Sequence, residues 1–322
     1  MKNSFISKPL FKQSLKANWV IWLIMTLGST AIFFIVNVVV CSHNIFTNID
    51  MNGVSSYVKD ENLSWLVILG LMEKMGFSLA RIQTMSTIDI NSIISDLFYK
   101  IAGTMLPMIY VIVVSNALIS RQVNDGSMAY VLSTPTSRKT VVRTQFLFML
   151  ASLMAMYFVI GLAALGSETI AGFIRLAANP NAQNMIPLKT ILFVTASFCA
   201  MFALMGVCFG ASAFFNKSSN SIALGGGVCV FCFLACILGL FGTPVFVSVG
   251  VGVQAMNIFN YMTLFTLIDT DGMTAFSKYV YYNGADGYLS LNWIWEIAIM
   301  LAAGLLIAYI GGRIFVKKDL PL

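Results

Sequence analysis

Charged residues are scarce in this sequence: Asp, Glu, Lys and Arg together make up 10% of its 322 residues, whereas hydrophobic residues make up 58%. Soluble globular domains carry about 25% charged residues. A chain with so few charges cannot cover its apolar surface with polar groups in water, which excludes an ordinary soluble domain. The composition therefore indicates an integral membrane protein.

Residues for catalysis are scarce as well. The chain has one histidine, His43, so no Ser-His-Asp or Cys-His set for nucleophilic catalysis can be assembled. It also has no G-x-x-x-x-G-K-[ST] sequence, which excludes a P-loop that cradles nucleotide phosphates. We therefore expect no enzyme activity and no cofactor in this chain. Any energy taken from ATP must come through another chain.

Long apolar runs, by contrast, are abundant. A helix needs about 20 apolar residues to cross a membrane. The crossings must be helical, because an open strand would leave backbone N–H and C=O groups unpaired in lipid. The sequence thus predicts an all-α, polytopic membrane bundle that forms one domain over 1–322. The six predicted spans are 19–41, 100–120, 144–166, 190–215, 221–241 and 293–312.

The distribution of positive charge predicts the orientation of the chain. Lys and Arg are enriched in the cytoplasmic loops of membrane proteins. If both termini are cytoplasmic, the inner segments hold twelve of the nineteen cations but only two of the thirteen acids, Asp125 and Asp319. This asymmetry favours cytoplasmic N- and C-termini. The net charge of +6 is then a sign of membrane orientation rather than of nucleic-acid binding.

Three segments lie outside the spans on this topology. Residues 1–18 combine Lys and apolar side chains at helical spacing, which predicts an interfacial helix. Residues 42–99 form a long, acidic extracellular loop. Residues 242–292 form an extracellular or re-entrant segment. A seventh span in this region is the alternative, but it would place the basic C-terminal residues outside the cell.

A polar stretch, RQVNDGSMAYVLSTPTSRKTVVR at 121–143, lies between the second and third predicted spans. Asp125 or Ser127 can cap the start of a short helix. Pro135 ends that helix, because proline lacks an N–H and constrains the residue before it. Ser137 is placed to cap the next helix. The stretch is therefore a predicted cytoplasmic loop that contains a helix of about two turns.

Gly126 eases the turn into this short helix. Met128, Val131 and Leu132 fall on one face of it, and Tyr130 flanks that face. We expect these apolar side chains to be exposed. Two interpretations remain open: the helix packs on lipid and on the protein's own spans, or it is a docking site for a soluble partner.

The same stretch resembles the first intracellular loop of ABC transporter permeases of the type-2 exporter class. In that family Gly-Thr/Ser, an aromatic or acidic position, Leu-Leu-Ser and Pro-x-Ser/Thr-Arg follow one another in this order. The C-terminal tail GGRIFVKKDLPL and the plan of six spans after an amphipathic helix resemble the family too. The matching loop residues are Gly126, Ser127, Tyr130, Leu132, Ser133, Pro135, Ser137 and Arg138.

The resemblance implies a coupling helix that sits in a groove of a separate ABC ATPase subunit. Two permease chains, identical or different, would assemble with two ATPase chains that bind ATP-Mg. The chain would lie in a bacterial plasma membrane and export its substrate. The implied coupling residues are Asp125, Gly126, Met128, Tyr130, Val131, Leu132, Pro135 and Arg138.

The centres of the predicted spans contain no charged residue, which bears on substrate and energy source. Uncharged spans favour an amphipathic or hydrophobic substrate. The alternative function is a secondary transporter driven by an ion gradient. Such a transporter is expected to place ionisable residues at mid-membrane, so the sequence favours an exporter whose energy arrives from a partner.

Two further patterns are candidates for sites. Gly206 and Gly210 form G-x-x-x-G in the fourth predicted span, which predicts close packing against another helix. Glu296 is the one acid within a predicted span, near its outer end. It is a candidate either for the substrate path or for an interfacial anchor.

Cys229, Cys232 and Cys236 share one face of the fifth predicted span. Thiolates could hold Cu(I) or zinc, but three ionised thiolates are costly in a bilayer. Free cysteine also behaves as a small hydrophobic residue. We therefore expect buried thiols and no metal site.

Overall fold

The computed structural model describes residues 6–41, 99–100, 103–133, 136–178, 186–243, 247, 252–284 and 288–318. Within these ranges the regular elements are helices, and six are long and apolar enough to cross a membrane. The prediction of an all-α bundle with six spanning helices is therefore confirmed. The six are α1 (Lys8–Cys41), α6 (Gly103–Leu118, extended by the short α7, Ser120–Asn124), α9 (Arg138–Ala178), α10 (Pro187–Phe214), α11 (Ser218–Leu240) and α14 (Asn292–Lys317).

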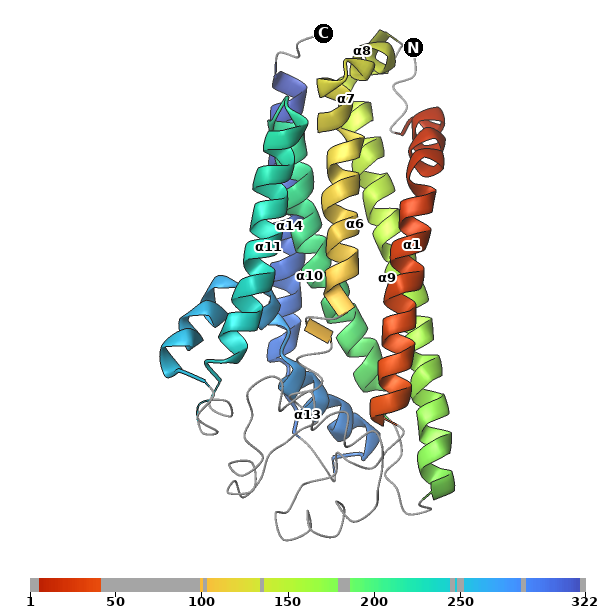
Figure 1. The fold of residues 1–322 in the computed structure, drawn as a ribbon, viewed down its shortest axis with the longest axis vertical. Coiled ribbons are helices and arrows are strands. Elements are labelled where there is room, and N and C mark those ends of the chain that lie inside the picture. Colours follow the sequence, from red (N-terminus) through yellow and green to blue (C-terminus); the bar gives the residue numbers. More distant parts are fainter. Residues whose placement is uncertain are drawn as a thin grey trace.

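The spanning helices run side by side, so the bundle has two ends (Figure 1). One end holds the start of α1, α7, the short helix α8 (Ser127–Ser133) and the end of α14. The opposite end holds α13 (Thr270–Tyr281). We call the first the basic end because of the cations gathered there, which are Lys8, Lys12, Lys16, Arg121, Arg138, Lys139, Arg143, Lys217, Arg313, Lys317 and Lys318.

Helix α1 extends well beyond the predicted first span. It runs without a break from Lys8 to Cys41, so the described part of the predicted interfacial helix and the span form one helix. Leu10 and Ser14 near its start are buried. A helix of 34 residues is about 50 Å long, whereas the hydrocarbon core of a bilayer is about 30 Å thick. The first turns of α1 therefore extend beyond that thickness.

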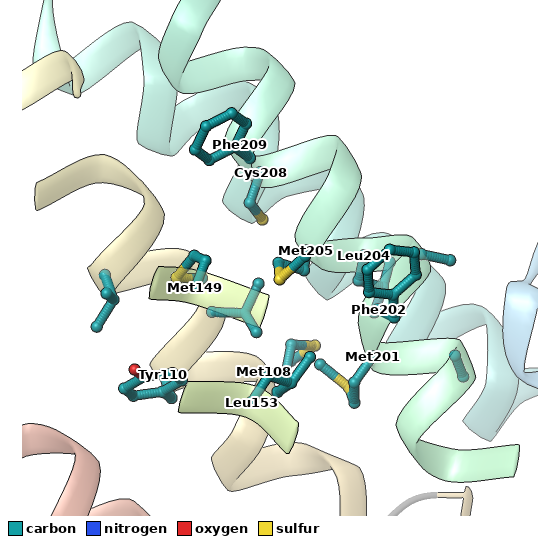
Figure 2. Packing of buried hydrophobic residues seen from close by; sticks show 14 of the residues in the cluster. Met108, Tyr110, Met149, Leu153, Met201, Phe202, Leu204, Met205, Cys208 and Phe209 are labelled. Carbon is teal, nitrogen blue, oxygen red and sulfur yellow. The ribbon is translucent and has the colours of Figure 1, made fainter. Parts of the chain in front are cut away.

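Helix α10 is the centre of the bundle, whereas α1 lies at its edge. In the most apolar stretch of α10, 78% of the residues are buried, against 17% in α1. Helix α10 packs on α6, α9, α11 and α14. Methionines fill the space where α6, α9 and α10 meet, because a flexible thioether side chain adapts to irregular gaps (Figure 2). They are Met108, Met149, Met201 and Met205.

The segment after α11 turns back on the bundle. The 3-10 helices η2 (Gln254–Met262) and η3 (Leu264–Leu267) pack against α11. Asn260 Nδ2 donates to the Gly239 carbonyl (3.0 Å), and Thr263 Oγ1 donates to the Cys232 carbonyl (2.8 Å), two turns before α11 ends. In the described part of the predicted segment 242–292, the chain therefore folds back on α11, and no helix long enough for a seventh span forms.

Some predicted features lie outside the described residues. They are the outer loop up to residue 98, which includes His43, the helix-ending Pro135, and the tail from Asp319. The rest of the predicted coupling loop is described, with a gap only at 134–135.

Candidate functional site

The loop between α6 and α9 folds as two short helices joined by a tight turn. Helix α7 ends at Asn124 and α8 begins at Ser127. Between them Gly126 has a φ of +72°, which residues with a Cβ rarely adopt. The Gly126 N–H donates to the Val123 carbonyl (3.2 Å), and the Ala129 N–H donates to the Gly126 carbonyl (3.1 Å). Glycine is required by the backbone conformation and not by lack of space, because nothing lies within 4 Å of an added Cβ.

The two faces of α8 differ sharply in exposure. Met128 is fully buried in the core, and Val131 and Leu132 pack partly against it. Tyr130, by contrast, is 80% exposed. The expectation of an exposed face formed by Met128 and its neighbours is therefore wrong. Because α8 lies across the ends of the spans, its apolar stripe finds cover on the protein itself, and the flanking Tyr130 is the large side chain that points outward.

The polar residues at the turn lie on the α7 side. The Asp125 carboxylate is 3.5 Å from Arg121 Nε, in an exposed ion pair of the i, i+4 kind. Such exposed pairs contribute little to stability. The Ser127 hydroxyl donates to the Gln122 carbonyl (3.2 Å). Both side chains that were predicted to cap α8 thus interact with α7, and the Ser127 hydroxyl joins the start of α8 to α7.

The start of α9 is tied to two other spans. The Thr140 N–H donates to Ser137 Oγ (3.2 Å), so Ser137 caps α9 as predicted. Arg138 Nη1 donates to the Lys318 carbonyl at the end of α14 (2.7 Å). Lys318 Nζ in turn donates to the Phe214 carbonyl at the end of α10, and burial lowers the pKa of Lys318. These bonds satisfy carbonyls at helix C-termini and join the short-helix region to α10 and α14.

Helix α1 is attached to α9 by polar side chains that sequence reasoning did not single out. Ser14 Oγ donates to Gln145 Oε1 (2.8 Å) within the buried interface. Further along, Trp22 Nε1 donates to the Ser152 carbonyl (2.9 Å), and Tyr110 OH of α6 donates to Ser152 Oγ (2.8 Å). The only signal in the sequence was the presence of Ser, Gln and Trp within apolar runs.

A comparison with protein families decides the identity. The model of the family described as ABC-2 family transporter protein matches residues 16–320 of this chain. The chain belongs to the ABC-2 transporter family. The comparisons with curated proteins and with solved structures find no match. The predicted membership in this class of ABC permeases is thereby confirmed.

Membership makes this chain the permease, the multi-pass membrane component of an ABC transporter. Proteins of this kind are typically not catalytic themselves, and the family implies association with an ABC ATPase. The short helices α7 and α8 of the permease, together with the anchored start of α9, are the candidate site for that association.

Gly206 and Gly210 of the permease face α14. A Cβ added to Gly206 would overlap the backbone of Gly304, and one added to Gly210 would lie 3.1 Å from Cγ2 of Ile307. From the other side, a Cβ on Gly311 would come within 2.6 Å of Gly210 Cα. The two helices therefore cross with their backbones in direct contact, which only small residues permit.

Glu296 lies in the second turn of α14, at the end opposite the basic end. Its Oε2 atom is buried and has no hydrogen-bond partner among the described residues. Asp269, before α13, and Lys100 both interact with it electrostatically. The carboxylate is therefore influenced by one acid and one base at the end of the bundle opposite the basic end.

The cysteines of the permease pack as small apolar residues. Cys208 Sγ of α10 lies 3.3 Å from Cys229 Sγ of α11. Five cysteines are buried and free of disulfides: Cys199, Cys208, Cys229, Cys232 and Cys236. Over the described ranges, no group of three or more His, Cys, Asp and Glu residues could hold a metal ion.

Proposed function

We propose that the permease couples ATP hydrolysis by a separate ABC ATPase subunit to the export of an amphipathic or hydrophobic substrate. In this proposal α8 is the coupling helix, and the partner binds ATP-Mg. The observation that supports it is the geometry of α8. This helix presents one large exposed side chain, Tyr130, on a base fixed by the burial of Met128.

A coupling element must transmit force, and α8 is connected for this. Its Met128 packs in the core, its N-terminal turn joins α6, and its C-terminal side leads into α9. Through Arg138 and Lys318 the start of α9 is hydrogen-bonded to the ends of α14 and α10. A push on α8 would therefore reach α6 along the chain, and the bonded starts and ends of α9, α10 and α14 would move with it.

The orientation follows from the same assignment. ATP is a cytosolic molecule, so α8 and both termini of the chain would face the cytoplasm, in a bacterial plasma membrane as the family resemblance implies. The gathering of cations at the basic end supports this orientation, because Lys and Arg are enriched on the cytoplasmic side.

The complete exporter would contain a second permease, identical or related, and two ATPase chains. The outer carboxylate of Glu296, half-buried and flanked by Asp269 and Lys100, would then lie on or near the substrate path. A secondary transporter is not favoured, since the family is that of ATP-driven transporters and the described span centres carry no charge.

Exchange of Tyr130 tests the proposal directly. The tagged permease is co-expressed with a candidate ABC ATPase that it retains on purification, and the amount of ATPase retained is measured. We expect Tyr130→Asp to reduce retention at least tenfold, because the charge replaces an aromatic contact at the centre of the interface. The matched control is Tyr288→Asp, which changes a 62% exposed tyrosine at the opposite end and should leave retention unchanged. Full retention by Tyr130→Asp would contradict the coupling role of α8.

Orientation is tested separately with Tyr130→Cys. A maleimide that does not cross membranes should label this cysteine only after the cells are permeabilised. The test uses a Cys41→Ser background, because Cys41 ends α1 at the end of the bundle opposite α8. The other five native cysteines are buried and give little background. Labelling in intact cells would place α8 outside and remove the basis for coupling to an ATPase.

A further inference from the structure

We propose that the permease binds an anionic phospholipid in a groove between α9, α10 and α14 at the basic end. The groove encloses about 590 Å³. We call it the basic groove and define it by its lining residues, which are Lys139, Val142, Arg143, Phe146, Phe209, Leu305, Ala308, Tyr309, Gly312, Arg313, Val316 and Lys317. The inference is independent of the proposed coupling role of α8 and of the direction in which the chain faces.

Four cations stand around the groove in two pairs. Lys139 and Arg143 are four residues apart on α9, and Arg313 and Lys317 are four residues apart on α14, so each pair lies on one helix face. No acid is among the described residues that line the groove. Like charges at this spacing repel one another, and an anion between the two helices would relieve the repulsion of both pairs.

The position of Lys139 and Arg143 on α9 also favours binding of an anion. Lys139 and Arg143 occupy the first two turns of α9, where the backbone N–H groups already carry partial positive charge. The first turn contains no acid to offset it. Cations are usually placed at the opposite end of a helix, so the start of α9 is an electrostatically favourable place for a negative group.

The floor of the groove is apolar and lies deeper in the bundle than the cations. Phe146, Phe209 and Leu305 line this part, and Leu305 is 52% exposed. Leu305 precedes Lys317 by twelve residues, which is about 18 Å along a helix. A ligand that fills the groove must therefore carry a negative head and a long apolar tail, which is the chemistry of an anionic phospholipid. Basic pockets between spanning helices bind such headgroups.

The side chain of Arg313 is held over the groove. Its Nε donates to the Tyr309 hydroxyl (2.8 Å), and its guanidinium lies 5.1 Å from the centre of the Tyr309 ring. A guanidinium fixed in this way keeps its other N–H groups available for a bidentate contact with phosphate. The enrichment of cations on one side of a membrane explains their presence at this end, but not their gathering around one apolar groove.

Native mass spectrometry of the purified full chain tests the proposal. The protein is titrated with phosphatidylglycerol and, separately, with phosphatidylcholine of the same acyl chains. We expect adducts of phosphatidylglycerol at concentrations at least tenfold lower. The double variant Arg143→Gln, Arg313→Gln should weaken phosphatidylglycerol binding about tenfold or more. The reason is that each cation near an anionic headgroup adds to the binding free energy, and the variant removes two of them. The control Lys8→Gln with Lys217→Gln removes two exposed cations of the same end outside the groove and should bind as the parent does.

Several outcomes would overturn the proposal. These are equal binding of both lipids, an unchanged affinity in the groove variant, and an equal loss in the control. Displacement of the lipid by millimolar inorganic phosphate would show a headgroup site without a role for the apolar floor. A dimer that the groove variant converts to monomer, with lipid binding unchanged, would assign the groove to a second copy of the chain. If the first variant does not fold, Lys139→Gln with Lys317→Gln provides the same comparison.

Discussion

Helices α10 and α1 are both long and apolar and both pack along a neighbouring helix, but their contacts differ in kind. Helix α10 crosses α14 with backbone against backbone, at Gly206 and Gly210 on one side and Gly304 and Gly311 on the other. Helix α1 is mostly exposed and is attached to α9 by side-chain hydrogen bonds, such as the one from Ser14 to Gln145.

The difference shows which forces are available to a membrane helix. Lipid tails are as apolar as leucine, so burial of apolar surface does little to hold spanning helices together. Close packing and hydrogen bonds remain. Close packing holds the central helix α10, because its glycines allow the backbone of α14 to approach over several turns. The outer helix also packs along α9, and it adds hydrogen bonds through a few polar groups on its buried face.

The largest effect is expected at the backbone contact. Gly206→Ala adds a methyl group that overlaps Gly304 of α14, and it should lower the free energy of unfolding by about 2 kcal/mol. Reversible unfolding of the purified permease in dodecyl sulfate measures this. Gly227→Ala on α11 is the matched control, because nothing lies within 4 Å of its added Cβ. It should be neutral or stabilising by about 0.5–1 kcal/mol. Equal effects of the two variants would mean that the crossing does not depend on small residues.

An intermediate effect is expected for α1. Ser14→Ala leaves Gln145 Oε1 without its donor in a buried interface, at a cost of about 1–2 kcal/mol. A double-mutant cycle with Gln145→Ala isolates the pair. Thr30→Ala serves as the control, since the exposed Thr30 hydroxyl bonds only to its own helix in the described contacts. An additive cycle would show that this hydrogen bond does not hold α1 on α9.

The smallest effect is expected on the outward face of α1. Ile24 is 59% exposed, and Ile24→Ala should change the free energy of unfolding by less than about 0.5 kcal/mol, because lipid covers the alanine as well. Leu204→Ala on α10 removes a fully buried side chain and should cost about 2 kcal/mol or more. A large cost for Ile24→Ala would instead indicate that another protein chain covers this face.

The fold could be predicted from sequence to the level of its six spans, since apolar length and charge distribution are visible in single segments. The short helix of the loop and the cap at Ser137 could be predicted as well, from Gly126 and from the spacing of the polar residues. The burial of Met128 could not be predicted from the sequence. The apolar face of α8 that includes Met128 and Val131 has the same sequence pattern whether it binds a partner or packs on the ends of the protein's own helices.

The number of spans and the gathering of cations at one end were determined by the sequence itself. The physical reason is that insertion into a bilayer depends on the hydropathy and charge of each segment alone. Only the tertiary structure decided that Arg138 reaches Lys318, that α10 rather than α1 lies at the centre, and that four cations surround one apolar groove. A helix that is apolar on every side does not encode its rotation about its own axis, and contacts between helices depend on that rotation.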